Sequence, residues 1–326
     1  MTPSSDSNLT AQLQRLRNAH ARDITPAWPQ RAQRLRKLET MLMEQREAFV
    51  AAINTDFGQR PAEETELLEV FPSLSGVRHA LRHGKRWMKP RRALAGLAFL
   101  PARNELRPQP RGVIGIIVPW NYPLLLAVGP LVDALAAGNR VMVKMSEFTP
   151  RCSALFAEQI ARCFEPDEVV VVNGGADVAQ AFSALAFDHL LFTGSTAVGR
   201  QVMRAAAANL TPVTLELGGK SPAIIGPGAQ FDRAVERIMF GKLVNAGQTC
   251  IAPDYVLLPR AQVGDFIAGA RRTVARMYPQ LAHNRQYASI ICDRQYQRLL
   301  ALREDAQAAG AQLHPLDETS DDAARR

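Results

Sequence analysis

The sequence contains only four cysteines in 326 residues, and their positions argue against two classes of protein. Cys152, Cys163, Cys250 and Cys292 show neither the spacing of metal ligands nor the pattern of a disulfide framework. The N-terminal residues also lack the apolar segment of a signal peptide. We therefore expect free thiols in a reducing cytoplasm, each of them either a small buried side chain or a nucleophile.

Features of a membrane protein or a nucleic-acid-binding protein are also scarce. The longest apolar stretch, from Gly112 to Gly138, is interrupted by three prolines and an asparagine. A buried strand, a turn and a buried helix explain it better than a membrane span. The net charge of +8 is modest, and the densest basic cluster, residues 82–92, accompanies no nucleic-acid-binding motif. We interpret this cluster as a solvated helix end rather than a surface for nucleic acid or anionic lipid.

The sequence does contain five short apolar runs that end in turn residues and alternate with amphipathic segments. These runs are GVIGIIVP, NRVMVKM, DEVVVVNGG, HLLFTG and PVTLELGG. Continuous apolar runs are typical of parallel strands buried on both faces, and their alternation with helices predicts a doubly wound α/β domain. Two helical segments, near 29–55 and 61–87, and a Pro-rich stretch with the character of a protruding ribbon precede the first run.

A second group of elements follows the last run. SPAIIG comes first, residues near 231–244 predict a helix, and DYVLLPR predicts a strand, with two more helices after it. The segment VNAGQTCIAP, which carries Cys250, lies between the predicted helix and the predicted strand. We therefore expect Cys250 near the start of a second domain, facing the first domain across a cleft.

Polar residues follow each of the five runs, at the edge where open α/β sheets bind ligands. TGSTAVG opens a helix directly after a strand, so free N–H groups and the helix dipole favour a pyrophosphate there. Gly194 allows close approach of a ligand, and Ser195 caps the helix or donates to a phosphate; the alternative is an ordinary helix cap. Lys144 and Glu147 are suited to grip the hydroxyls of an adenosine ribose, or are surface charges.

Three further side chains are candidates for chemistry. Glu216, in LELGGK, is expected at a buried strand end where desolvation raises its pKa and suits a general base; the alternative is a cap of the glycine turn. The amide of Asn121 offers donors for an oxyanion, or simply forms a turn. Cys250 follows Gly-Gln-Thr in a predicted turn and is a candidate exposed nucleophile, whereas the other three cysteines lie among helical residues and suit the inert alternative. Together these groups suit oxidation of an aldehyde through a thioester.

The motifs PWNYP, KMSE, FTGST, LELGGK and GQTCIAPDY occur in the order and at the separations found in the aldehyde dehydrogenase superfamily. The chain resembles this family over nearly all of its length beyond about the first thirty residues. AINTDFGQRPAEETELLE, the WMKP element and IAPDY are similar to the branch that oxidises coniferyl aldehyde and fatty aldehydes.

The resemblance implies an aldehyde dehydrogenase fold of the α/β class. A dinucleotide-binding domain over residues 1–217 would include the N-terminal helices and an oligomerisation ribbon near 93–110, and a catalytic domain would cover 218–326. The implied activity is NAD(P)-dependent oxidation of an aromatic aldehyde, such as coniferyl aldehyde, or of a medium-to-long apolar aldehyde to its acid. Cys250 would form a thiohemiacetal and then a thioester. Asn121 and the Cys250 N–H would hold the oxyanion, and Glu216 would activate water.

The resemblance also implies the cofactor site. Lys144 and Glu147 would bind the adenosine ribose and Ser195 the pyrophosphate, and the Glu147 carboxylate would favour NAD, with NADP as the alternative. The expected cofactor-binding residues are Pro119, Trp120, Lys144, Ser146, Glu147, Gly175, Phe192, Thr193, Gly194, Ser195, Val198, Leu217 and Gly218. No metal, nucleic-acid partner or membrane span is expected.

Members of the family continue beyond the part that this sequence matches. They carry a glutamate-phenylalanine motif for the nicotinamide ribose, the rest of the catalytic domain and a strand used for dimerisation. We accordingly expect a chain shortened at its C-terminus, with an incomplete catalytic domain, and a homodimer like that of the family. The alternative function is a non-catalytic, nucleotide-binding fragment of a truncated aldehyde dehydrogenase gene.

Overall fold

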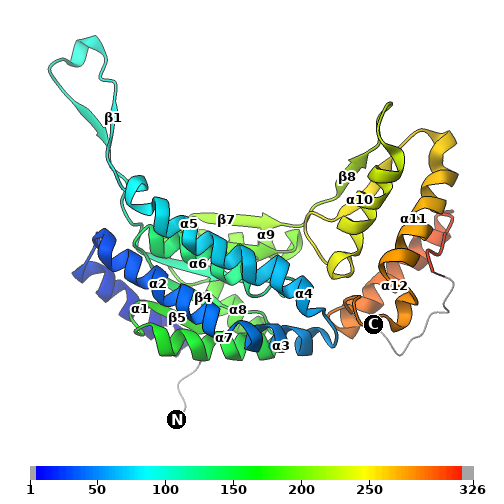
Figure 1. Cartoon of the computed structure of the whole chain (residues 1–326). Coiled ribbons are helices and arrows are strands. Elements are labelled where there is room, and N and C mark those ends of the chain that lie inside the picture. Colours follow the sequence, from blue (N-terminus) through cyan, green and yellow to red (C-terminus); the bar gives the residue numbers. More distant parts are fainter. Residues whose placement is uncertain (1–4, 318–326) are drawn as a thin grey trace. The chain divides into compact units, whose positions relative to one another are not determined.

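A computed structural model describes residues 5–317 of the chain, which divide into two compact units (Figure 1). Unit 1 extends to Phe49 and continues from Leu67 to Glu216, and unit 2 comprises Val50–Glu66 and the residues from Leu217 onward. The segment from Val50 to Glu66, which the sequence analysis placed with the first domain, packs in unit 2. The domain boundaries stay a prediction, and each unit is described below by itself.

The helices of unit 1 include one that the sequence analysis did not anticipate. In α1, Leu9, Leu13 and Leu16 recur at helical spacing and are buried. The helices expected near 29–55 and 61–87 are each interrupted, the second by a π-helical turn at Glu66–Val70. The helices of unit 1 are α1 (Ser5–Arg22), α2 (Trp28–Glu44), the start of α3 (Arg46–Phe57), α5 (Phe71–Trp87), α6 (Leu125–Ala136), α7 (Pro150–Cys163), α8 (Ala176–Ser183) and α9 (Thr196–Ala207).

A five-stranded sheet in the order β5-β4-β3-β6-β7 forms the centre of unit 1. All five strands expected from the apolar runs are confirmed: β3 (Val113–Ile117), β4 (Arg140–Lys144), β5 (Val169–Val172), β6 (His189–Gly194) and β7 (Val213–Leu217). β3, β4, β5 and β6 pair in parallel. The α/β class is therefore confirmed. Because the chain runs outward from β3 to β5 and then returns to β6, the strand order reverses between β3 and β6, where such sheets bind ligands.

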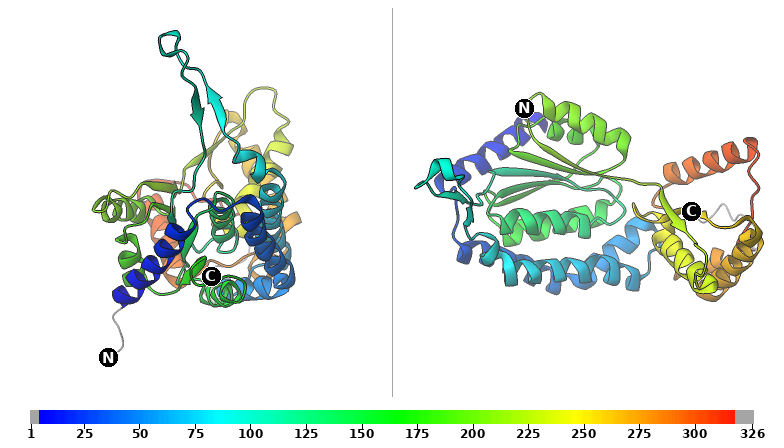
Figure 2. Two further views of the ribbon diagram at one scale, coloured as in Figure 1. Left: turned by 90° about the vertical axis from the view of Figure 1, so that its left-hand side faces the viewer. Right: turned by 90° about the horizontal axis from the view of Figure 1, so that it is seen from above.

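Helices cover both faces of this sheet. α6 and α7 lie on one face, with α2 and α5 packed outside them, and α1, α8 and α9 cover the other face (Figure 2). Every residue of β3 and β4 is buried, as expected for central strands, but no residue of β7 is fully buried. The expectation that all five strands are buried on both faces is thus wrong for β7, and β5 and β6 are only partly buried. β5 and β7 are the two edge strands of the sheet.

The Pro-rich stretch before β3 forms a two-stranded ribbon. β1 (Arg91–Ala93) pairs antiparallel with β2 (Asn104–Leu106), and all residues of both strands are exposed (Figure 1). A 3-10 turn at Leu97–Phe99 closes the ribbon and exposes apolar side chains. Its part in oligomerisation stays a prediction.

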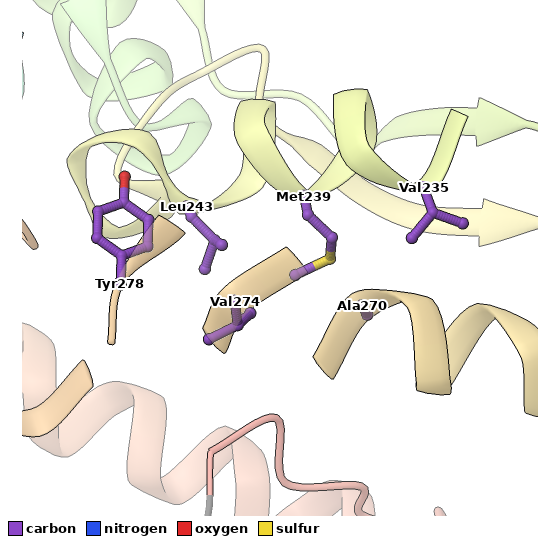
Figure 3. Close-up of a cluster of buried hydrophobic side chains, with 6 residues drawn as sticks. All are labelled: Val235, Met239, Leu243, Ala270, Val274 and Tyr278. Carbon is purple, nitrogen blue, oxygen red and sulfur yellow. The ribbon is translucent and has the colours of Figure 1, made fainter. Parts of the chain in front are cut away.

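Unit 2 is built on a parallel strand pair and a helix pair. β8 (Ser221–Ile224) pairs in parallel with β9 (Pro253–Leu257). Apolar side chains four residues apart on α10 meet a matching set on α11, which closes a small core (Figure 3). The core residues are Val235, Met239 and Leu243 on α10, Ala270 and Val274 on α11, and Tyr278 directly after α11. The helices of unit 2 are the end of α3, α4 (Ala62–Thr65), α10 (Phe231–Leu243), α11 (Val263–Met277) and α12 (Asp293–Ala308).

Within residues 5–317, none of the helices has the length and apolar character that crossing a membrane requires.

Candidate active site

The strands of unit 1 end side by side, and this register aligns the residues that follow them. Ile117 of β3 pairs with Lys144 of β4 and with Phe192 of β6, and Lys144 also pairs with Val172 of β5. Residues directly after these positions therefore share one edge of the sheet. The structure brings together there the predicted cofactor residues that follow the four parallel strands: Pro119, Trp120, Ser146, Glu147, Gly175, Thr193, Gly194 and Ser195.

Lys144 and Glu147 form an ion pair at this edge. The Lys144 side chain is only 2% exposed and that of Glu147 is 40% exposed, with 3.7 Å between Nζ and Oε2. Lys144 Nζ also donates a hydrogen bond of 2.6 Å to the backbone oxygen of Met145. Burial lowers the pKa of Lys144, and the charges of Glu147 and Asp177 oppose that shift. A buried ammonium beside a solvent-facing carboxylate supplies a donor and an acceptor for neighbouring hydroxyl groups.

The turn from β6 into α9 has the geometry of an anion site. Ser195 caps the helix, with its Oγ accepting the Val198 N–H at 3.3 Å, and both residues are exposed. A Cβ at Gly194 would lie 2.5 Å from the Phe192 ring, so no larger residue fits there without a shift. The first N–H groups of a helix carry partial positive charge, which favours a phosphate at this end. Both readings of the motif, cap and anion site, are compatible in this turn.

Gly175 holds a comparable place between β5 and α8. It precedes the helix as an extended residue, and the side chain of the neighbouring Asn173 donates 3.1 Å to the backbone oxygen of Ser153 in α7. Ser153 Oγ in turn donates 3.0 Å to the backbone oxygen of the buried Ser146. These bonds connect the ends of β4 and β5 and hold the edge in place.

Asn121 lies half-buried in the turn between β3 and α6. A residue that the sequence analysis missed, Glu69, holds this turn. Its side chain is fully buried and Oε2 accepts the N–H groups of Leu124 at 2.7 Å and Leu125 at 3.1 Å. A carboxylate at a helix N-terminus satisfies orphan donors and interacts favourably with the helix dipole. No local sequence signal connects Glu69 with α6, because 55 residues separate it from Leu124.

A cavity of about 380 Å³ lies between α5 and α6 in unit 1. Ser73, His79 and Asp133 contribute polar groups to its lining. Ser73 is buried and its Oγ has no hydrogen-bond partner among residues 5–317, while burial raises the pKa of Asp133. A Cβ at Gly129, which also lines the cavity, would meet no described atom within 4 Å apart from its chain neighbours and the backbone of its own helix. No sequence pattern marks this cavity, because the cavity forms only where α5 and α6 meet.

Cys250 is exposed and lies in a turn of unit 2, as the sequence predicted. The Ala252 N–H donates 3.2 Å to the Thr249 oxygen, which closes the turn around Cys250. The backbone of Gly219 lies against this turn, so that a Cβ on Gly219 would be 3.5 Å from the Cys250 oxygen. The other cysteines differ: Cys152 is buried, and Cys163 and Cys292 are half-buried.

Glu216 does not have the expected environment. It lies near the end of β7 and is exposed, so the expectation of a buried carboxylate is wrong. The cause is again the position of β7 at the sheet edge. Asn121 and Glu216 belong to unit 1, whereas Leu217, Gly218 and Cys250 belong to unit 2. The catalytic and cofactor-binding roles of all these residues stay predictions.

In the described part of the chain, no group of three or more His, Cys, Asp and Glu side chains is arranged to hold a metal ion.

Comparison with known proteins finds the same family that the motifs resemble. Residues 12–323 match the model of the aldehyde dehydrogenase family. The chain is 52% identical over 308 residues to a probable coniferyl aldehyde dehydrogenase of Pseudomonas aeruginosa, covering 94% of this chain and 65% of the relative. It is 46% identical over 311 residues to the coniferyl aldehyde dehydrogenase of a Pseudomonas species, covering 95% of this chain and 64% of that protein.

Solved structures show the same fold. AldH of Staphylococcus aureus in a substrate-bound state superposes with a TM-score of 0.87 at 34% identity, covering 91% of this chain and 65% of that one. An aldehyde dehydrogenase of Mycobacterium tuberculosis complexed with NAD+ gives a TM-score of 0.84 at 30% identity, covering 94% and 64%. The chain thus spans just under two thirds of the length of these relatives. With a family match over residues 12–323 and a relative at 52% identity, the chain belongs to the aldehyde dehydrogenase family.

Proposed function

We propose that the chain carries the NAD(P)-dependent oxidation of an aldehyde to its carboxylic acid, with Cys250 as the nucleophile. The observation that carries this proposal is the exposed thiol of Cys250 in its turn, in contrast with three cysteines that are buried or half-buried. The names of two similar relatives support an aromatic substrate such as coniferyl aldehyde, and a medium-to-long apolar aldehyde is the second candidate.

The residues of the chain supply the proposed steps as follows. The Cys250 sulfur attacks the carbonyl carbon, and the resulting thiohemiacetal oxygen accepts hydrogen bonds from the Asn121 amide and the Cys250 N–H. After oxidation, Glu216 takes a proton from a water molecule that attacks the thioester carbon. Breaking the carbon–sulfur bond releases the acid and restores the thiol. Its exposure in β7 leaves Glu216 accessible to water.

The edge of the sheet in unit 1 fits a dinucleotide. Lys144 and Glu147 offer a donor and an acceptor to the adenosine ribose, and the capped N-terminus of α9 offers N–H groups to the pyrophosphate. A nicotinamide cofactor held by these residues would supply the acceptor for the hydride that the thiohemiacetal carbon loses as the Cys250 thioester forms. The partly exposed Glu147 carboxylate would repel a 2′-phosphate, so we propose NAD rather than NADP as the preferred cofactor.

The cavity between α5 and α6 is proposed to hold the part of the aldehyde remote from the carbonyl. Gly129 and Asp133 lie on the helix that follows Asn121, roughly 6 and 12 Å beyond its first residue at 1.5 Å per residue. Ser73 and Asp133 offer polar partners for a phenolic hydroxyl, while Gly129 leaves room for a ring. Gly129→Leu should therefore raise KM for a cinnamaldehyde-type substrate at least fivefold and leave KM for acetaldehyde unchanged.

Two further proposals concern the setting of the protein. A homodimer is supported by the exposed apolar side chains of the ribbon, among them Leu94 at 100% and Leu97 at 88% exposure. A cytoplasmic location is supported by the four free cysteines, because thiols persist in a reducing compartment.

NADH formation by the purified chain, with NAD and either cinnamaldehyde-type or hexanal-type substrates, tests the proposed function. Binding of NAD is measured separately by calorimetry. We expect turnover that depends on both aldehyde and NAD. Retained NAD binding without turnover of either substrate class would contradict the enzyme and support the non-catalytic fragment.

A further inference from the structure

The segment before Cys250 has an unusual backbone. Three successive residues adopt left-handed conformations: Asn245 with φ 52° and ψ 32°, Ala246 with φ 51° and ψ 33°, and Gly247 with φ 73°. Glycine adopts such angles freely, but a residue with a Cβ does so only under strain. A Cβ on Gly247 would also lie 3.0 Å from the Lys242 oxygen. Side chains other than those of residues 245–247 must hold these angles, since left-handed backbone persists only where its surroundings impose it.

Glu64 of α4 supplies one such restraint. Its Oε2 accepts the N–H of Asn245 at 3.0 Å, at the first left-handed residue. Burial raises the pKa of this carboxyl group, and the Asn245 N–H and the charge of Arg60 partly oppose the shift. Burial raises the pKa values of Tyr278 and Tyr287 to about 12, and the nearby charge of Glu64 adds to both shifts. Glu64 is therefore a half-buried acceptor behind the cysteine segment.

Gln248 supplies the second restraint from within the segment. Its Nε2 donates 2.9 Å to the Asn245 oxygen and 3.0 Å to the Ser289 oxygen. Its Oε1 accepts the N–H of Ile291 at 2.9 Å. The side-chain amide of Gln248 thus bonds three backbone groups, one at Asn245 in its own segment and two at Ser289 and Ile291.

These contacts determine where Cys250 begins its turn. Only Thr249 separates Gln248 from Cys250, and the turn closes at Ala252. Pro253 then enters β9 and pairs with Ser221 of β8. The backbone that carries the thiol is therefore held on the N-terminal side by Glu64 and Gln248 and on the C-terminal side by the strand pair.

We propose that Glu64 and Gln248 are positioning residues for Cys250, which impose the left-handed backbone of residues 245–247 and thereby fix the thiol. The catalytic consequence rests on the proposed role of Cys250 as the nucleophile. The positioning of the loop by Glu64 and Gln248 does not depend on that role, because the loop has its conformation with or without turnover.

Matched substitutions separate the hydrogen bonds from the volume of each side chain. Glu64→Gln keeps an oxygen that accepts the Asn245 N–H, whereas Glu64→Leu removes it at similar volume. Gln248→Glu keeps the acceptor for Ile291 but places an oxygen against two carbonyl groups, and Gln248→Met removes all three bonds. Gln286→Met, at an exposed glutamine of the same unit, is the control.

The readout is the alkylation rate of Cys250 by iodoacetamide, followed by mass spectrometry, with half-buried Cys163 of unit 1 as the internal reference. The synthetic peptide VNAGQTCIAP gives the rate for an unheld loop. We expect wild-type Cys250 to differ from the peptide at least fivefold. Glu64→Leu, Gln248→Met and Gln248→Glu should shift the rate to within twofold of the peptide. Glu64→Gln and Gln286→Met should stay within twofold of wild type.

Turnover gives a second readout. The three disruptive variants should lower kcat at least tenfold, with KM for NAD changed less than twofold, and Glu64→Gln should retain most of kcat. If Glu64→Leu does not fold, the Gln248 variants carry the test. Wild-type Cys250 reacting like the peptide, or folded Gln248→Met keeping the wild-type alkylation rate, would overturn the proposal. If the wild type shows no turnover but the alkylation rates change as expected, the proposed function fails and the positioning role stands.

Discussion

The turn that carries Asn121 and the loop that carries Cys250 are each held by a glutamate, but against different backbones. Glu69 accepts the N–H groups of Leu124 and Leu125 at the start of α6, an ordinary helix end. Glu64 accepts the N–H of Asn245 at the start of a left-handed run. A helix end presents free N–H groups and a favourable dipole, so one carboxylate suffices there. Residues 245–247 adopt left-handed angles that residues with a Cβ disfavour, and Gln248 holds them in addition to Glu64.

The comparison indicates two ways of placing a functional group. In unit 1 the polar groups follow from regular secondary structure, because parallel strands end together at one edge. In unit 2 the thiol depends on side-chain contacts that hold a strained segment. Substitutions in the two regions should therefore have distinct effects on cofactor binding, stability and thiol reactivity.

The largest expected effect is a loss of turnover while NAD binding at the sheet edge of unit 1 is retained. Cys250→Ala should lower turnover by roughly a thousandfold or more, because the nucleophile is absent. The Kd of NAD should stay within twofold of wild type, as measured by calorimetry. Cys163→Ala is the matched control and should keep wild-type turnover. Substantial turnover by Cys250→Ala would show that the chemistry does not depend on this loop.

A substitution at Lys144 should affect the sheet edge of unit 1 and leave the Cys250 loop unchanged. Lys144→Met removes a buried ammonium and its hydrogen bonds, so the Kd of NAD should rise by about tenfold to a hundredfold. Alkylation of Cys250 should not change. Lys220→Met, at a lysine side chain that is 80% exposed, serves as the control and should leave the Kd unchanged. Equal effects of the two substitutions would argue against a specific role of Lys144.

The cap at α6 should respond in stability. Glu69→Leu leaves two backbone donors without their acceptor in a buried site, which should lower the free energy of unfolding by about 2–4 kcal/mol. Glu69→Gln keeps an acceptor and should lose about half as much. Urea denaturation measures both variants. An unchanged stability of Glu69→Leu would mean that this turn does not depend on the Glu69 carboxylate.

The pH dependence of stability should distinguish Glu64 from Glu168, a third carboxylate whose pKa is shifted. Burial raises the pKa of Glu64 above 4.5, so its stabilising contribution is complete below that value and is lost as the pH rises through its folded pKa. For Glu168, burial favours a higher pKa, but the hydrogen bond and charge of Arg34 and the charge of Lys37 lower it. The contribution of Glu168 is therefore present above pH 4.5 and is lost as the pH falls through its folded pKa.

Urea denaturation across pH 3–8 measures this contrast. Glu64→Gln should remove a fall in stability with rising pH, and Glu168→Gln should remove a fall with decreasing pH and cost roughly 1–2 kcal/mol at neutral pH. Slopes of the same sign for the two variants would contradict the assignment.

The smallest expected effect concerns the strain itself. Ala246→Gly replaces a left-handed alanine by a residue that adopts this backbone freely, so it should stabilise the protein by about 0.5–1 kcal/mol. Ala301→Gly, at an exposed position within α12, should instead destabilise it by about 1 kcal/mol. Thermal denaturation of the two variants gives the signs. Destabilisation by Ala246→Gly would mean that the left-handed run is not strained.

Much of unit 1 was predictable from the sequence for a physical reason. Each of the five strands is an apolar run of four to six residues, and the turn residues that end the runs mark the sheet edge directly. Lys144, Ser195 and Asn121 were predicted at this edge because they end or follow such runs, and their roles stay predictions. The exposure of Glu216 was missed because an apolar run does not say whether its strand lies at the centre or the edge of the sheet. α1 was missed although Leu9, Leu13 and Leu16 carried a helical signal.

The sequence by itself determined the strands, the motifs at their ends and the family, since these depend on residues close together in the chain. Only the tertiary structure decided which side chains hold the turns that carry Asn121 and Cys250. Glu64 is 181 residues from Asn245, and Gln248 is 43 residues from Ile291. No local periodicity connects such pairs, because they meet only after the elements between them have folded.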